Sequence, residues 1–332
     1  MKQIKIGQSG PMVSCLGYGA MSFSDFYGAT TDENSFAILD EAMEAGVTHL
    51  DSANVYGMGR SERVIGDYLR ARPEARDHFH IATKATITRD ADGNRIFRND
   101  PEHLEAELDA SLKRLGVEAV DLFYAHRRDK GIPIEETAEA LGSMVKKGKA
   151  KAIGLSEVSP VSVARAHAVH PIAAVQSEYS LSTRSPELGL VQMCDRIGAT
   201  MVAFSPVGRS YLTDNPLSWD AVQAQPFLAT NPRFTPETYA ANLAATDGFR
   251  ALAADMGLAA SGLAIAWLLA QGDHVLPIPG TRSVAHFREM VEGANRVLTE
   301  EELAAVEKVL PAGWAHGDRY SDVQWIGPER FC

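Results

Sequence analysis

An aspartate and a tyrosine stand close together in residues 49–62, HLDSANVYGMGRSE. Residues 48–51 have the composition of a short strand, and residues 61–62 open an amphipathic run. Asp51 is therefore expected at the end of a strand and Tyr56 on the loop that leads to a helix, where parallel α/β folds carry their chemistry. Alone, the pair is explained more simply by a capping aspartate and a tyrosine that packs in a loop.

Two further polar residues follow predicted strands in the same way. Lys84 ends the strand expected at residues 79–83, and His126 follows the one at residues 120–125. Either alone is more often structural, as a surface lysine or a hydrogen-bonding histidine. Together with Asp51 they are expected to converge on one mouth. A carboxylate can hold an ammonium beside a phenol, and the ammonium makes the phenol more acidic. Tyr56 is thus expected to donate a proton to a carbonyl oxygen.

The elements that must position these residues form a repeating pattern. Eight short, apolar, β-branched runs alternate with helical stretches, and a Ser9-Gly10-Pro11 turn suggests a hairpin before them. The pattern predicts a single (β/α)8 TIM barrel across residues 1–332, with an N-terminal β-hairpin and a long loop after strand seven. A doubly wound open sheet competes, but no G-x-G-x-x-G follows the first strand and no Walker loop is present.

The bounds of these elements are predicted from apolar periodicity and from glycine or proline punctuation. The strands are expected at residues 13–16, 48–51, 79–83, 120–125, 152–155, 172–175, 201–204 and 275–278. The helices are expected at residues 34–45, 64–69, 104–115, 134–145, 161–169, 186–197, 249–256, 261–270, 284–294 and 300–309. Residues 207–239 show no clear periodicity and are expected to form the long loop.

Composition and charge favour a globular protein that acts on a small molecule. The chain is 45% hydrophobic and 23% charged, and 43 acidic against 32 basic residues leave a net charge of -11. This excludes a basic surface for nucleic acid and a polybasic membrane anchor. Residues 262–270 are too short an apolar run to span a bilayer, and the amino terminus lacks the apolar core of a signal peptide.

The cysteines and histidines suggest neither disulfides nor a metal centre. Cys15, Cys194 and Cys332 are scattered and form no disulfide framework or ligand cluster, and His-rich ligand spacing is absent. A reducing cytoplasm is therefore the expected location, and no metal is expected in the site.

Seven motifs resemble those of the aldo-keto reductase superfamily, of the longer kind that includes the potassium-channel β subunits. They are LDSANVYGMGRSE (50–62), IATK (81–84), SLKRLGVEAVDLFYAHR (111–127), AIGLSE (152–157), VQSEYSL (175–181), AFSPVGR (203–209) and PIPGTR (277–282). The resemblance covers nearly the whole chain. It implies that Asp51, Tyr56, Lys84 and His126 are a catalytic tetrad. It also implies that a nicotinamide dinucleotide binds in extended form without a Rossmann domain, beside a small-molecule carbonyl substrate. A homo-oligomer is compatible with this assignment.

The same resemblance implies contacts for each part of the cofactor. Ser156 and Gln176 would hold the nicotinamide carboxamide, and Phe204 would stack on the ring. The wider set is Gly19, Ala20, Met21, Asp51, Ser156, Gln176, Phe204, Ser205, Val207, Gly208, Arg209, Gly280, Arg282, Ser283, His286 and Glu289. Three positions depart from the family pattern: Glu157 and Met290 each stand where an Asn is common, and Phe204 where a Tyr is. The Phe keeps a stacking face but drops a hydroxyl.

The turn at residues 279–283 suggests an anion site from its own chemistry. The amino end of the following helix offers unpaired N–H groups, Ser283 a hydroxyl, and Arg282 a planar charged fork suited to phosphate. The 2′-phosphate of NADPH matches these groups. The alternative is that Arg282 is solvated and Ser283 only caps the helix.

Aromatic residues in two loops are candidates for the substrate wall beside Tyr56 and His126. Phe23 or Tyr27 would come from the first loop, and Tyr211 or Trp219 from the long one, which favours apolar or aromatic carbonyls. Equally, the aromatic residues of the long loop could form a small core of their own.

The leading hypothesis is an NADPH-dependent reductase that converts an aldehyde or ketone to an alcohol, with the proton from Tyr56. The alternative from another class is a cofactor-sensing binding protein with slow chemistry, like the channel β subunits, because a shared fold does not fix function. A cofactor-free hydrolase or lyase on the same barrel is a more distant third.

Overall fold

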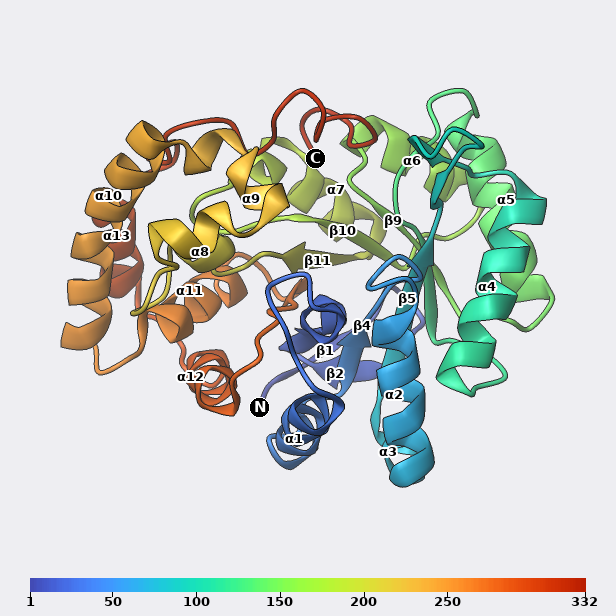
Figure 1. Cartoon of the computed structure of the whole chain (residues 1–332), viewed down its shortest axis with the longest axis horizontal. Helices are drawn as coiled ribbons and strands as arrows, with labels where there is room; N and C mark the ends of the chain where they lie inside the picture. Colours follow the sequence, from blue (N-terminus) through green and yellow to red (C-terminus); the bar gives the residue numbers. More distant parts are fainter.

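Eight parallel strands form one sheet at the centre of the molecule (Figure 1). The computed structural model describes residues 1–332. In spatial order the strands are β3 (Gly17–Gly19), β4 (His49–Asp51), β5 (His80–Ala85), β8 (Leu122–Ala125), β9 (Ile153–Ser156), β10 (Ala174–Glu178), β11 (Thr200–Phe204) and β12 (Val275–Pro277). The amide of Gly19 donates to the carbonyl of Pro279 at 2.9 Å, which links the two edges of the sheet. The predicted (β/α)8 barrel is confirmed, and the open sheet is excluded.

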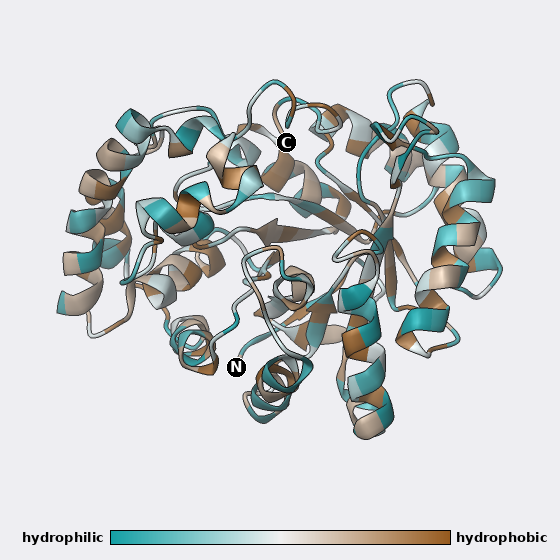
Figure 2. Cartoon of the chain, in the orientation of Figure 1, coloured by the Kyte–Doolittle hydropathy of each residue, from teal (hydrophilic) through white to brown (hydrophobic).

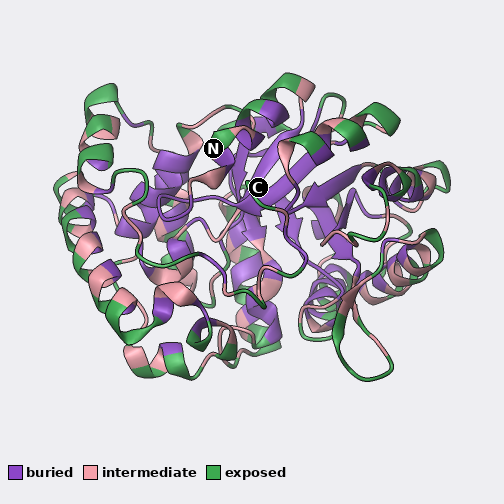
Figure 3. Cartoon of the chain, turned by 90° about the horizontal axis from the view of Figure 1, so that it is seen from above, coloured by how far each residue is buried: buried purple, intermediate pink, exposed green.

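Helices surround the strands, and their apolar faces turn inward (Figure 2). The long ones are α1 (Asp32–Glu44), α2 (Arg60–Ala71), α4 (Pro101–Leu115), α5 (Ile134–Lys146), α6 (Pro160–Val169), α7 (Leu190–Ile197), α10 (Pro236–Asp255), α11 (Ala260–Leu269), α12 (Val284–Ala294) and α13 (Glu300–Val309). A single turn, α3 (Ala75–His78), follows α2. The strands and the inner helix faces are buried, and the outer faces are exposed (Figure 3).

Local chemistry fixes where a helix such as α4 begins and ends. The Asp100 side chain accepts a hydrogen bond from the amide of His103 at 3.0 Å, and Pro101 occupies the first turn. Gly116 ends the helix with φ of 69°, a left-handed conformation that favours glycine. These signals are visible in the sequence, which is why the end of this helix was predicted correctly.

The first barrel strand was placed wrongly. Residues 13–16 read as a strand, but β2 (Met12–Ser14) pairs antiparallel with β1 (Gln3–Lys5) in the N-terminal hairpin. The barrel strand is the glycine-bearing β3. A Cβ on Gly19 would lie 2.7 Å from the carbonyl oxygen of Ile278, so only glycine fits where the barrel closes. Strand propensity favours residues 13–16 instead, because propensity takes no account of contacts with residues far along the chain.

The segment after β11 was also predicted incompletely. Residues 207–239 contain η3 (Gly208–Ser210), α8 (Trp219–Gln223), α9 (Pro226–Ala229) and η4 (Pro232–Phe234), and α10 begins at residue 236 rather than 249. The helix expected at residues 186–197 divides into η2 (Ser185–Leu188) and α7 at Gly189, whose φ is 141°. A short 3-10 segment, η1 (Ala20–Ser24), follows β3.

A second hairpin, β6 (Ile87–Arg89) and β7 (Arg95–Phe97), leaves the carboxyl end of β5 and was not foreseen. Its turn is tied by Asp90, whose carboxylate accepts from the amides of Asp92 and Asn94 at 3.0 and 2.8 Å. No helix by itself has the length and apolar character to cross a membrane; α10 and α11 reach both only as a pair bent by 86°.

Two histidines of adjacent strands are buried against each other. The Nδ1 atoms of His49 and His80 lie 2.9 Å apart, and neither Nε2 atom has a hydrogen-bond partner. One Nδ1 must carry a proton and the other must accept it, so the pair suits two neutral rings. Burial lowers the pKa of His80 to about 4, and burial and His80 hold that of His49 well below its ordinary value.

This pair predicts a loss of stability in mild acid. Because the folded-state pKa is depressed, the histidines stabilise the fold above the unfolded pKa near 6.5 and cease to do so as pH falls. For His80, whose folded-state pKa is about 4, the fall from pH 7 to pH 5 should lower the free energy of unfolding by about 2 kcal/mol. His80→Gln should lessen this acid loss, as measured by urea unfolding at both pH values. The exposed His316→Gln is the control, and an unchanged pH dependence in His80→Gln would contradict the assignment.

Candidate active site

The four polar residues singled out in the sequence meet at the carboxyl end of three neighbouring strands. Asp51 is the last residue of β4, Lys84 lies on β5, and His126 directly follows β8. These strands are adjacent in the sheet. Tyr56 lies on the loop between β4 and α2. All four side chains therefore converge on one mouth of the barrel, as expected.

A buried ion pair lies at the centre of this group. The Lys84 ammonium bonds to the Asp51 carboxylate, donates to the carbonyl of Ser52 at 2.8 Å, and lies 3.5 Å from the Tyr56 hydroxyl. The second carboxylate oxygen of Asp51 accepts from the Gln176 amide at 2.8 Å. Burial alone would lower the pKa of Lys84, but Asp51 and Tyr56 outweigh it and raise that pKa. The lysine is therefore a fixed cation beside the phenol.

His126 completes the group as a neutral ring. Burial, followed by the nearby charges of Arg127, Lys84 and Arg95, holds the pKa of His126 well below its ordinary value. The rings of His126 and Tyr56 meet edge to face with centroids 5.8 Å apart, and His126 Nδ1 has no partner in the protein. A neutral imidazole here can offer one hydrogen bond to an oxygen placed beside the tyrosine.

A cavity of about 1200 Å³ opens above these groups and reaches the start of α12. It exceeds the roughly 300–1,000 Å³ usual for a single drug-sized ligand, so it has room for two. Thirteen of the sixteen residues expected to bind the cofactor line it: Gly19, Met21, Asp51, Gln176, Phe204, Ser205, Val207, Arg209, Gly280, Arg282, Ser283, His286 and Glu289. Ala20, Ser156 and Gly208 are buried beside the cavity without lining it.

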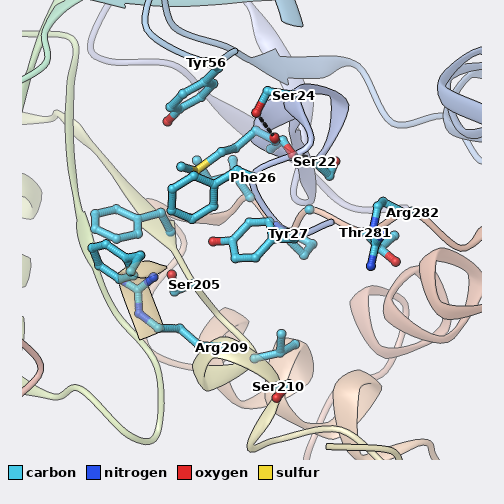
Figure 4. A pocket seen from close by; sticks show the side chains of 18 of the residues that line it. Ser22, Ser24, Phe26, Tyr27, Tyr56, Ser205, Arg209, Ser210, Thr281 and Arg282 are labelled. Atoms are coloured by element: carbon cyan, nitrogen blue, oxygen red, sulfur yellow. Dashed lines mark hydrogen bonds between the residues drawn. The ribbon is translucent and has the colours of Figure 1, made fainter. Parts of the chain in front are cut away.

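The turn after β12 has features of both predictions, the anion site and the helix cap with a solvated arginine. Ser283 is the N-cap of α12, and its hydroxyl accepts from the amide of His286 at 3.3 Å. Arg282 is exposed and has no acidic partner; its Nη1 donates to the carbonyl of Ala29 at 2.9 Å. Figure 4 shows Arg282 at the edge of the cavity, on the far side of Tyr27 from Tyr56. An unneutralised guanidinium thus lies beside a helix amino terminus.

Arg209 is already neutralised. Its guanidinium pairs with the buried carboxylate of Glu178 at 2.8 Å and lies 4.7 Å from the ring centroid of Phe227. It belongs to the wall of the cavity and carries no free charge for an anion.

Three of the expected substrate-wall residues do not line the cavity, and that part of the prediction is wrong. Phe23 is buried in the main core, where its ring stacks on Tyr18 at 5.2 Å. Tyr211 and Trp219 pack in the separate small core of the long segment, the alternative that the sequence left open. The Tyr211 hydroxyl donates to the carbonyl of Arg233 at 2.6 Å. Of the four aromatic candidates only Tyr27 lies in the cavity, with Tyr56 and His126.

The aromatic wall is instead built by Phe26, Phe227 and Tyr320 together with Tyr27. Phe26 lies 5.8 Å from Phe227, and Phe227 lies 6.3 Å from Tyr320, between ring centroids. These residues come from the first loop, α9 and the C-terminal segment. Phe26 could have been found beside Tyr27. Tyr320 carries no local signal, because it follows the last helix in a stretch without periodicity.

The fold and the site together define a barrel enzyme with an acid-base group at the carboxyl ends of its strands. A protein-family model described as "Aldo/keto reductase family" matches residues 15–311. The chain belongs to the aldo-keto reductase family, and it is an oxidoreductase that acts on carbonyl groups.

Relatives and solved structures agree with this assignment over almost the whole chain. "Aldo-keto reductase str7" of Strobilurus tenacellus is 40% identical over 95% of this chain and 94% of its own. "Probable aldo-keto reductase 1" of Glycine max is 36% identical over 96% of this chain and 92% of its own. The glycerol dehydrogenase AKR11B4 from Gluconobacter oxydans superimposes with a TM-score of 0.81 at 27% identity, covering 93% of this chain and 94% of that one.

The buried ion pair makes a stability prediction. Lys84→Met leaves the Asp51 carboxylate uncompensated in the core, which should cost about 3–5 kcal/mol of unfolding free energy. Adding Asp51→Asn removes that charge and should recover part of the lost free energy of unfolding. Both the single and the double variant lack the Lys84 ammonium. Urea unfolding of both single variants and the double variant gives the coupling between the two sites. Additive losses would show that the pair does not act as a unit.

Proposed function

We propose that this protein catalyses the NADPH-dependent reduction of an aldehyde or ketone to the alcohol. The observation that carries the proposal is the Asp51–Lys84–Tyr56–His126 group at the floor of a cavity that extends to the Arg282 turn. When bound, the reduced nicotinamide would supply a hydride to the carbonyl carbon. The carbonyl oxygen takes a proton from Tyr56, and the resulting phenolate regains one from solvent.

Each residue of the catalytic group has a role that follows from its position. Lys84 lies 3.5 Å from the Tyr56 hydroxyl, so its charge stabilises the phenolate left after proton transfer. Asp51 holds Lys84 in place, and Gln176 holds Asp51. His126 is neutral and orients the carbonyl oxygen without competing for the proton.

The residues that line the cavity fit a dinucleotide with an additional phosphate. At one end Gln176 and Phe204 offer an amide and a flat apolar face, the partners expected for the nicotinamide ring. At the other end Arg282 is an arginine without an acidic partner, next to Ser283 and the first amides of α12. A phosphate there would meet a positive charge and free N–H groups.

The same four residues would serve the reverse direction. The glycerol dehydrogenase of Gluconobacter oxydans is named for the oxidation of an alcohol. In that direction the Tyr56 phenolate would accept the alcohol proton, with Lys84 holding its charge. We propose carbonyl reduction as the reaction of this chain, carried out by residues 1–332 as one barrel domain.

Tyr56→Phe tests the acid directly. General acid catalysis contributes about 10²–10⁴-fold, so kcat for an aldehyde should fall by that factor while NADPH still binds. NADPH oxidation measures turnover, and quenching of protein fluorescence measures binding. Tyr211→Phe, which removes a buried hydroxyl that bonds the Arg233 carbonyl and does not line the cavity, should keep its turnover. Parental rates in Tyr56→Phe would rule out this tyrosine as the proton donor.

Arg282→Ala tests the choice of cofactor. A lost charge-assisted contact to phosphate is worth about 1.5–3 kcal/mol, so the dissociation constant for NADPH should rise about ten- to a hundredfold. That for NADH should change little. The matched control is Arg288→Ala on α12, whose guanidinium pairs with Glu41 at 2.6 Å. Equal losses for both cofactors would mean that Arg282 does not bind the 2′-phosphate.

A further inference from the structure

Three arginines without acidic partners line the cavity beside the catalytic group. They are Arg89, Arg95 and Arg127, and none lies within 4.0 Å of a carboxylate, whereas most other arginines of the chain do. With a net charge of -11 the protein has carboxylates in excess. Unpaired guanidinium groups in one place therefore do not follow from composition. They give this part of the cavity wall a positive charge.

The three guanidinium groups share one edge of the cavity. Arg89 and Arg95 are directly opposite each other across the β6–β7 hairpin, so their side chains leave the same face. Arg127 follows His126 in the chain and donates to its carbonyl at 2.7 Å. Desolvation by neighbouring groups and the charge of Arg127, with that of Arg89, lower the pKa of Arg95. Like charges in such proximity destabilise the free protein and favour an anion between them.

The hairpin that carries Arg89 and Arg95 is anchored to the rest of the barrel. Thr86 exchanges two hydrogen bonds with the backbone of Arg127, at 2.9 and 3.0 Å. Phe97 packs beneath Gly327 of the C-terminal segment, where a Cβ would come within 2.6 Å of the ring. The Arg95 guanidinium lies 5.1 Å from the centroid of the same ring. The hairpin is thus anchored, and the exposed side chains of Arg89 and Arg95 extend from it at the cavity.

This wall lies across the barrel from the proposed phosphate site. Arg127 follows β8 and Arg282 follows β12, and in the eight-stranded order three strands separate β8 from β12 on either side. A cofactor phosphate at Arg282 leaves Arg89, Arg95 and Arg127 free. Their neighbours are His126 and Tyr56, where the substrate carbonyl would lie.

We propose that Arg89, Arg95 and Arg127 form a subsite for an anionic group of the substrate, a carboxylate or a phosphate ester. The substrate is then a carbonyl compound with such an anion at its far end. Guanidinium forks match the paired oxygens of both groups. This inference rests on the proposed reduction, and it replaces the expectation of an uncharged apolar or aromatic carbonyl. The aromatic wall of Phe26 and Phe227 would contact the carbon skeleton between the two ends.

Matched substrates test the subsite. 4-Carboxybenzaldehyde is compared with its methyl ester, and glyceraldehyde 3-phosphate with glyceraldehyde, by kcat/KM with NADPH. The anionic member of at least one pair should be preferred about ten- to a hundredfold, mainly through KM. The preferred pair identifies the anion as carboxylate or phosphate. No preference in either pair overturns the subsite.

Variants tie the preference to these residues. Arg89→Ala/Arg95→Ala should remove most of the preference by lowering kcat/KM for the anionic member alone, while the neutral member is unaffected. Arg98→Ala is the control, because Arg98 lies on the same segment outside the cavity and pairs with Asp100 at 2.8 Å. Equal losses on both members would indicate a structural effect and contradict the subsite.

A binding measurement separates this inference from the proposed function. 4-(Hydroxymethyl)benzoate and its methyl ester are titrated calorimetrically into the protein with NADP+ present, for the parent and the double variant. Tighter binding of the acid that is lost in the variant supports the subsite even if no aldehyde is reduced. Equal affinities overturn it even if both aldehydes are turned over. Absence of turnover on every aldehyde would overturn the proposed function alone.

Discussion

The ion pair between Lys84 and Asp51 is the constraint on which the rest of the site depends. Two charges removed from water carry a large desolvation cost, which is offset only by close geometry and by hydrogen bonds to the remaining polar atoms. Here the Ser52 carbonyl and the Gln176 amide provide those bonds. Gln176 reaches Asp51 from β10, on the far side of the mouth from β4. The Gln176–Asp51 hydrogen bond can therefore form only when the barrel is closed, because the two residues come from strands on opposite sides of it.

A fixed cation at the floor of the cavity also shapes the charges around it. Lys84 and Arg127 help to keep His126 neutral, because a further positive charge there would be repelled. Arg89, Arg95 and Arg282 extend the positive charge along the walls, although the whole chain is acidic. Asp25, Asp214 and Glu289 also line the cavity, so the positive charge is local. Clustered charges of one sign in a cleft concentrate the field on a ligand beside them. Such a cavity suits reactants that carry negative charge at points away from the reacting carbonyl.

The walls of the cavity are assembled from segments that are distant in the chain. The C-terminal segment, red in Figure 1, crosses back over the barrel after α13 and brings Tyr320 to the cavity. A buried ion pair anchors it: Arg319 donates to the carboxylate of Glu157 at 3.0 Å. Glu157 is a departure from the family pattern, where an Asn is common. The structure accounts for it, because an amide would not neutralise the buried guanidinium.

The sequence by itself determined the barrel and the reacting group. Strand ends are local in sequence, and parallel strands must bring their carboxyl ends to one face, so Asp51, Lys84, His126 and the loop of Tyr56 followed from the order of elements. Sequence could not determine the place where the barrel closes or the shape of the cavity. Gly19 lies in a barrel strand because its backbone contacts that of Ile278, far along the chain. The cluster of Arg89, Arg95 and Arg127 likewise depends on the absence of carboxylates around it in space. A count of charges in the sequence cannot show that absence. Tertiary structure alone decided that Tyr211 and Trp219 pack in a separate core, while Tyr320 and the unforeseen β6–β7 hairpin face the cavity, because burial is set by contacts between distant segments.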